Sequence, residues 1–144
     1  WLESIGIPEP DVVAVAFLAN YTAGGGAFNN PKGALRSKGL IEYRGDKLSL
    51  TVAGRVRVEI IDEVLTTEKL HDKVLSRLPG PERKILKPLL EVYPGELTLE
   101  ELAEKADYEV NGGAFNNPKA RLRSLGLIEY LPGRKVKARD ILFL

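Results

Sequence analysis

Amide and basic side chains recur at the same spacing in two segments of this 144-residue chain. Each segment contains the run Ala-Phe-Asn-Asn-Pro-Lys, and further lysines and arginines follow it. Asparagine can form two hydrogen bonds with adenine, while lysine and arginine can reach guanine or a phosphate group. The side-chain chemistry therefore predicts binding of nucleic acid. The candidate nucleic-acid-binding residues are Asn29, Asn30, Lys32, Arg36, Lys38, Arg44 and Lys47 in the first segment, and Asn116, Asn117, Lys119, Arg121, Arg123, Arg134, Lys135 and Lys137 in the second.

Positive charge is concentrated in the same two segments. Residues 21–57 hold seven lysines and arginines against two acidic residues, and residues 108–144 hold seven against three. The rest of the chain holds seven against fifteen, so the net charge of +1 conceals a strong segregation of charge. One basic run is usually just a solvated face, but its repetition favours a polyanionic partner, and double-stranded DNA is the partner we expect.

The two segments are copies of one unit. Residues 21–43 and 108–130 are identical at 17 of 23 positions, and matching residues are 87 apart in the sequence. Two copies indicate a pair of domains, because a solenoid needs three or more repeats. We place the first domain at residues 1–52, linking helices at 53–80 and the second domain at 81–144.

The second copy predicts three helices followed by a two-stranded hairpin. Gly80-Pro81 begins the first helix, and Thr98 begins the second, with Glu101 completing a capping box. Phe115, Leu122 and Leu125 mark the buried face of the third helix. The expected helices span residues 80–93, 98–108 and 114–125, and the expected strands span 127–130 and 135–144.

This order of elements is that of a winged-helix domain. In helix-turn-helix proteins the third helix enters the major groove, and the hairpin, or wing, contacts the backbone or the minor groove. The first copy matches from its second helix onward. Its first helix would begin before Trp1, so we expect that helix to be truncated and the chain to be a piece of a longer protein. The predicted fold class is mainly α with small β wings.

The remaining elements of the first copy and of the link follow from the same patterns. Asp11 is the expected cap of the second helix, and a run of glycines turns the chain into the third. After the hairpin, apolar residues recur every four positions, which favours a helix over a strand. The expected helices span residues 12–21, 27–38, 52–65 and 67–78, and the expected strands span 40–43 and 47–51.

The second helices of the two copies have different surfaces. Val13, Ala14, Phe17 and Leu18 of the first copy align with charged residues of the second. A helix that is apolar on every side is normally buried. We therefore interpret these four residues as a protein interface. The linking helices, an upstream domain and a second protomer are the partners that could cover it.

The asparagine run also has a structural interpretation. Proline is tolerated in the first helical turn and asparagine can cap a helix, so Asn-Asn-Pro can serve the fold alone. Pro31 and Pro118 stand where a recognition helix would offer a base-reading side chain. Base contact and a structural role therefore both stay open for the asparagines.

The sequence contains no constellation that predicts catalysis or metal binding. The chain has no cysteine, and its single histidine, His71, is expected on a helix surface or at a helix cap. The longest apolar run, residues 12–19, is far shorter than the roughly 20 residues of a membrane span. We expect a cytoplasmic protein that is not an enzyme and uses no cofactor, metal or membrane.

The second copy also resembles a segment of a known family. Its pattern from Tyr108 to Ile128 is Tyr-x-x-x-Gly-Gly-x-Phe-x-Asn-x-x-x-x-Leu-Arg-Ser-x-Gly-Leu-Ile. This pattern is similar to a winged-helix segment found near the C-terminus of prokaryotic ATP-binding proteins of the translocase or helicase type. The resemblance implies a winged-helix fold, and an accessory or regulatory region of a larger DNA-acting machine.

The leading hypothesis is thus a DNA-binding tandem winged-helix region in which the third helices and wings form the basic surface. The alternative is a protein-interaction or oligomerisation module that uses the apolar second helix of the first copy.

Overall fold

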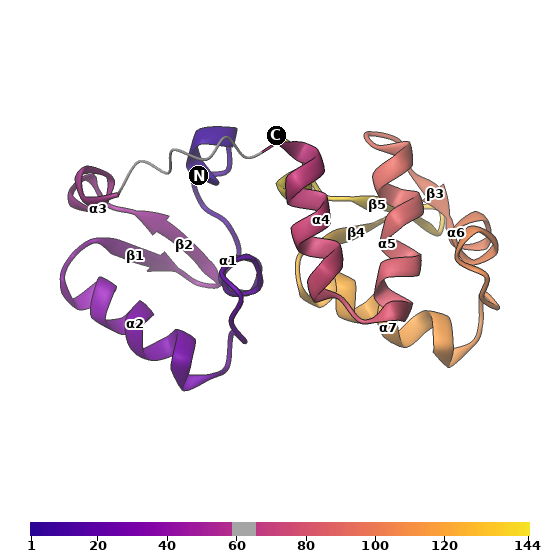
Figure 1. Ribbon diagram of the computed structural model, residues 1–144, viewed down its shortest axis with the longest axis horizontal. Coiled ribbons are helices and arrows are strands. Elements are labelled where there is room, and N and C mark those ends of the chain that lie inside the picture. Colours follow the sequence, from indigo (N-terminus) through magenta and orange to yellow (C-terminus); the bar gives the residue numbers. More distant parts are fainter. Residues whose placement is uncertain (59–65) are drawn as a thin grey trace. The chain divides into compact units, whose positions relative to one another are not determined.

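The computed structural model describes residues 1–58 and 66–144 of the chain. The fold is mainly α-helical with two small antiparallel sheets, as the sequence predicts. The chain divides into two compact units, Trp1–Leu65 and Thr66–Leu144, which we call unit 1 and unit 2 (Figure 1). Each unit holds one copy of the repeat.

Unit 1 places a hairpin after the basic helix. The described elements are the 3-10 helix η1 (Glu3–Ile5), α1 (Val12–Leu18), α2 (Gly26–Ser37), β1 (Ile41–Arg44), β2 (Lys47–Leu50) and α3 (Val52–Arg57). In the hairpin Ile41 pairs with Leu50, and Arg44 pairs with Lys47 across the turn. Gly45 in this turn has a φ of 63°, a conformation that glycine adopts without steric cost. The predicted hairpin is therefore confirmed to within one residue at each end.

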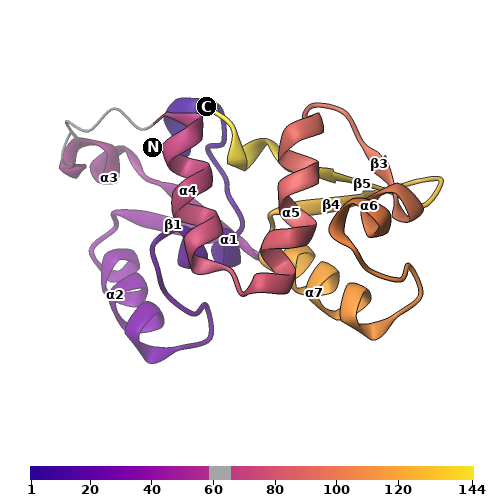
Figure 2. The same cartoon turned by 45° about the vertical axis from the view of Figure 1, so that its right-hand side comes forward.

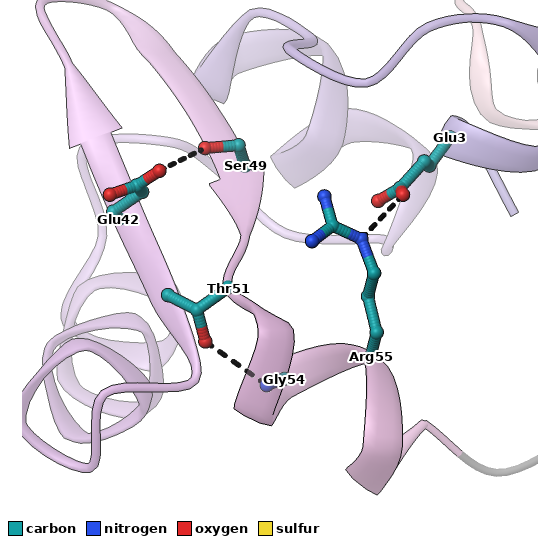
Figure 3. Close-up of polar contacts among 6 residues, drawn as sticks. All are labelled: Glu3, Glu42, Ser49, Thr51, Gly54 and Arg55. Carbon is teal, nitrogen blue, oxygen red and sulfur yellow. Dashed lines mark hydrogen bonds and ion pairs between the residues drawn. The ribbon is translucent and has the colours of Figure 1, made fainter.

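Short polar contacts fix α3 beside the hairpin (Figure 3). The Thr51 hydroxyl accepts a hydrogen bond from the backbone N–H of Gly54 at 3.0 Å, which caps the helix. Arg55 Nε donates to Glu3 Oε1 at 2.5 Å and so joins α3 to η1. A Cβ on Gly54 would lie 1.9 Å from the carbonyl oxygen of Leu40. The helix can approach the hairpin this closely only with glycine at that position.

The helix predicted over residues 52–65 is shorter than expected. α3 ends at Arg57, and Val58 already has extended backbone. Residues 59–65 lie outside the described part of the chain. Val52 and Val56, on which the prediction depended, are 77% and 80% exposed. Valine favours a helix only weakly, so an exposed valine row gives little support to a longer helix.

Unit 2 contains three helices and a wing, preceded by one more helix. Its elements are α4 (Thr67–Arg77), α5 (Gly80–Val92), β3 (Leu97–Thr98), α6 (Leu99–Ala106), α7 (Gly113–Ser124), β4 (Ile128–Leu131), β5 (Lys135–Ala138) and the 3-10 helix η2 (Asp140–Leu142). α5 contacts α6, α7 and β5 (Figure 2). The side chains at the centre of this unit are fully buried: Ile85, Leu86, Leu89, Leu102, Phe115, Leu122 and Leu127.

The predicted capping box of α6 is confirmed. The Thr98 hydroxyl accepts from the backbone N–H of Glu101 at 3.2 Å, and the Glu101 carboxylate accepts from the backbone N–H of Thr98 at 2.8 Å. The hydrogen bond from the Thr98 backbone N–H, with a further contribution from the Thr98 side chain, lowers the pKa of Glu101. The short strand β3 was not predicted. It pairs Leu97 with Val136 of β5, a contact between residues far apart in the sequence.

The strand predicted over residues 135–144 is wrong beyond Ala138. Ile141 and Leu142 are both buried, which neighbouring residues of a strand with one buried face cannot be, and they form η2 instead. The Phe143 ring stacks on Tyr93, with 3.5 Å between ring centroids. His71 Nε2 lies 2.8 Å from the carbonyl oxygen of Leu142, so this nitrogen carries the proton. His71 on α4 therefore holds the C-terminal segment through its hydrogen bond to Leu142, and it does not lie on a fully exposed helix surface.

Candidate nucleic-acid interface

In unit 1, one tyrosine organises the basic side chains of α2. The hydroxyl of Tyr43, on β1, donates to the carbonyl oxygen of Lys32 at 3.0 Å. Its ring centroid lies 5.3 Å from Lys32 Nζ and 4.9 Å from the guanidinium carbon of Arg36. Phe28 approaches the same ammonium at 5.2 Å. The two cations, four residues apart on one face of the helix, thus lie on aromatic faces.

Unit 2 repeats this arrangement. Tyr130 on β4 lies 5.6 Å from Lys119 Nζ and 4.5 Å from the guanidinium carbon of Arg123, while Phe115 lies 4.6 Å from the ammonium. We call each group the aromatic–cation cluster of its unit: Phe28, Lys32, Arg36 and Tyr43 in unit 1, and Phe115, Lys119, Arg123 and Tyr130 in unit 2. The two tyrosines were not among the site residues predicted from the sequence. The signal was present, because both tyrosines are retained at the same place in the two copies.

The glycine turn places these helices identically in both units. α2 and α7 have bounds 87 residues apart, and their N-caps, Gly25 and Gly112, form no side-chain capping bond. The asparagines therefore lie within the first two turns of the helices and do not occupy the cap. Asn29, Asn30 and Asn117 are exposed, and Asn116 is half-buried.

The two lysines of the clusters differ in exposure. Lys32 is half-buried, whereas Lys119 is only 6% exposed. Lys119 Nζ donates a hydrogen bond to Asn116 Oδ1 at 2.9 Å. Burial lowers the pKa of Lys119, and the positive charge of Arg134 lowers it further. This interior position differs from the exposed phosphate contact that the sequence suggests for Lys119.

Most of the other predicted cations form ion pairs with acidic residues of their own unit. Arg121 Nη1 binds the buried carboxylate of Glu82 on α5 at 2.6 Å. Hydrogen bonds to Glu96 and Glu129 raise the pKa values of Lys135 and Lys137, respectively. The remaining pairs are Arg44 with Glu9 at 3.2 Å, Lys47 with Asp11 at 2.6 Å, Arg134 with Glu100 at 2.9 Å, Lys135 with Glu96 at 2.5 Å and Lys137 with Glu129 at 3.1 Å.

The cations without an acidic partner are unequally divided between the units. Among the predicted residues, all of which the structure describes, unit 1 has three: Lys32, Arg36 and Lys38. Unit 2 has one exposed example, Arg123, because Lys119 is buried and the others are paired. The acidic residues of unit 2 thus neutralise a wing that looks strongly basic in the sequence.

No protein-family model, curated protein sequence or solved structure matches this chain. The resemblance to translocase- or helicase-type proteins therefore stays a prediction. In the described ranges, no helix has the length and apolar character required to cross a membrane. The same ranges hold no group of three or more histidine, cysteine or acidic residues suited to a metal ion.

The predicted protein-interface residues do not form a continuous exposed surface. Val13 is 37% exposed, but Ala14 is fully buried, and Phe17 and Leu18 are partly buried. Asp11 stands at the N-cap of α1 without a side-chain capping bond, and its carboxylate binds Lys47 instead. α1 is thus held against the hairpin by this polar contact.

Proposed function

We propose that this chain binds double-stranded DNA through two winged-helix units, with the exposed cations of α2 making the strongest phosphate contacts. The repeated aromatic–cation cluster carries this proposal. A guanidinium group that lies over an aromatic ring can pack on the ring and keep its N–H groups available for hydrogen bonds. Arg36 and Arg123 can therefore donate hydrogen bonds to phosphate or to base edges while they remain stacked on the tyrosines.

The charge distribution supports unequal roles for the two units. Exposed ion pairs hold weakly, so the paired wing cations can turn toward a phosphate. Each one nevertheless has a carboxylate beside it, which repels DNA and reduces the gain. We infer that unit 1 supplies most of the electrostatic affinity, and that unit 2 binds mainly through Arg123 and the amide groups of α7.

Salt dependence tests the proposed function. Fluorescence anisotropy with a mixed-sequence duplex should detect binding at low salt. The logarithm of the association constant should fall against the logarithm of salt concentration with a slope of about −3 to −4, because four cations would each displace about 0.9 counterion. Absence of binding at about 20 mM salt, where electrostatic binding is strongest, would contradict DNA binding.

Self-association is a second candidate function, and one observation favours it. In unit 2, α5 packs on α7 and Leu122 is fully buried. Leu35, the matching residue of α2, is 42% exposed. An exposed leucine on a helix whose counterpart is covered by another helix is a suitable contact for a second copy of this chain.

Sedimentation of the whole chain over a range of concentrations tests this candidate. The wild-type chain should form dimers, and Leu35→Glu should shift it to monomer, because the carboxylate would lose water in the interface. Val56→Glu, an exposed change on α3, is the control and should leave the dimer intact. A wild-type chain that is monomeric throughout would exclude self-association.

A further inference from the structure

Lys119 lies in an enclosure formed by residues of unit 2. Its Nζ lies between the rings of Phe115 and Tyr130, at 4.6 and 5.6 Å from their centroids. It donates one hydrogen bond, to Asn116 Oδ1. A buried ammonium group is stable only when such partners replace water. With 6% exposure, Lys119 is poorly placed to meet a phosphate group itself.

The bond to Lys119 fixes the orientation of the Asn116 amide. An ammonium group can only donate, so the amide oxygen must be the atom that faces it. The amide nitrogen, with its two hydrogens, is then on the side away from the ammonium. Asn116 is half-buried near the start of α7, and the bond keeps its amide oxygen on the Lys119 side, so the amide hydrogens are the groups left to meet a bound base.

We propose that Lys119 is a positioning residue: by holding the Asn116 amide oxygen, it turns the amide hydrogens toward DNA and gives unit 2 a preference for guanine over adenine. The inference rests on the proposed DNA binding. Adenine requires asparagine to accept from its amino group and to donate to N7. Because the ammonium group holds the oxygen on the Lys119 side, the oxygen is not free to turn toward the amino group of adenine. Guanine offers two acceptors, N7 and O6, which suit a group that only donates.

Unit 1 has the same residue types, but its lysine and asparagine differ from those of unit 2 in burial and hydrogen bonding. Lys32 is half-buried and lies over Phe28 and Tyr43, and within the described part of the chain it forms no hydrogen bond with Asn29. The exposed Asn29 amide is therefore free to turn and to bind adenine through both of its groups. Identical Asn-Asn-Pro-Lys runs would then have different base preferences in the two units.

Two duplexes of equal length test this inference, one built of mixed A·T pairs and one of mixed G·C pairs. Fluorescence anisotropy would give the ratio of the two dissociation constants and the salt slope for each variant. Lys119→Met keeps the apolar stem and should reduce the preference for G·C by at least about fivefold, with the salt slope unchanged. The matched control Lys32→Met should weaken both duplexes alike and reduce the magnitude of the slope by about one.

A second variant shows whether the effect of Lys119→Met comes from the lost hydrogen bond or from misfolding. Asn116→Ala removes the amide and should reduce the G·C preference as much as Lys119→Met does. The double variant should show no further loss, because both changes break one interaction. If Lys119→Met instead weakened both duplexes equally and lowered the slope by about one, Lys119 would be a phosphate contact and the inference would be wrong. An unchanged G·C preference would also overturn it.

Measurements without DNA separate this inference from the proposed function. Lys119→Met should shift the Asn116 side-chain amide resonances in NMR spectra, whereas Lys32→Met should not shift those of Asn29. Because burial lowers the pKa of Lys119, the unfolded chain keeps this proton to a higher pH than the folded chain. The stability of wild type relative to Lys119→Met should therefore rise with pH between the lowered pKa and the ordinary lysine value. If wild type bound neither duplex, DNA binding and base preference would fail together, while the NMR measurement would still decide whether Lys119 orients Asn116.

Discussion

Reversing the charges of Arg36 and Lys38 together is expected to lower the DNA affinity of the chain on the order of 100-fold at low salt. Both side chains are exposed on or beside α2, and neither has an acidic partner in the described residues. Glutamate at these positions would replace two phosphate contacts with two repulsions. Anisotropy titrations of Arg36→Glu/Lys38→Glu against wild type measure the loss.

The wing of unit 2 provides the matched control. Arg134→Glu/Lys135→Glu changes the net charge of the chain by the same amount, but both residues form ion pairs with Glu100 and Glu96. We expect a loss below about tenfold, because these cations are already partly neutralised. Equal losses in the two variants would show that net charge, and not the surface of α2, determines the affinity.

Phe115→Ala is expected to have the largest effect on stability, a loss of about 3–5 kcal/mol in the free energy of unfolding. The Phe115 ring is fully buried in unit 2, pairs with Tyr108 at 6.4 Å and supports the ammonium of Lys119. Its removal leaves a cavity beside a buried charge. Urea denaturation followed by circular dichroism gives the change in free energy.

Phe28→Ala is the matched change in unit 1 and should cost less. Phe28 keeps 7% of its surface exposed, and the half-buried Lys32 above it can recover water when the ring is removed. Trp1 is the only tryptophan, so its fluorescence reports on unit 1 separately. A loss below about 1 kcal/mol for Phe115→Ala would mean that the cavity collapses and that the ring does not hold Lys119 in place.

The sequence predicted the elements whose signals are local. The glycine turn, the capping box at Thr98 and the repeat itself located α2, α6, α7 and both hairpins. Of the three residues predicted for the buried face of α7, Phe115 and Leu122 are fully buried and Leu125 is half-buried. The residues of the glycine turn and of the capping box lie within about one helical turn of the elements that they define, and the match between the two copies extended the assignment from one unit to the other.

Features that depend on distant residues were missed. Strand β3 exists because Leu97 pairs with Val136, and Arg121 is paired because Glu82 is buried on another helix. Neither partner can be identified from the neighbouring sequence. Lys32 and Lys119 also show the effect of distant residues, because both follow Ala-Phe-Asn-Asn-Pro in the sequence and yet differ in burial. The tertiary surroundings, and not the local run, decide which lysine is exposed.

The stacking of Arg36 on Tyr43 and of Arg123 on Tyr130 also has an entropic consequence. Immobilising a long side chain on binding commonly costs about 0.5–1.5 kcal/mol in lost rotamer freedom. A guanidinium group that already rests on a ring has lost part of that freedom during folding. For these two arginines, part of the ordering therefore takes place during folding, before a phosphate group arrives.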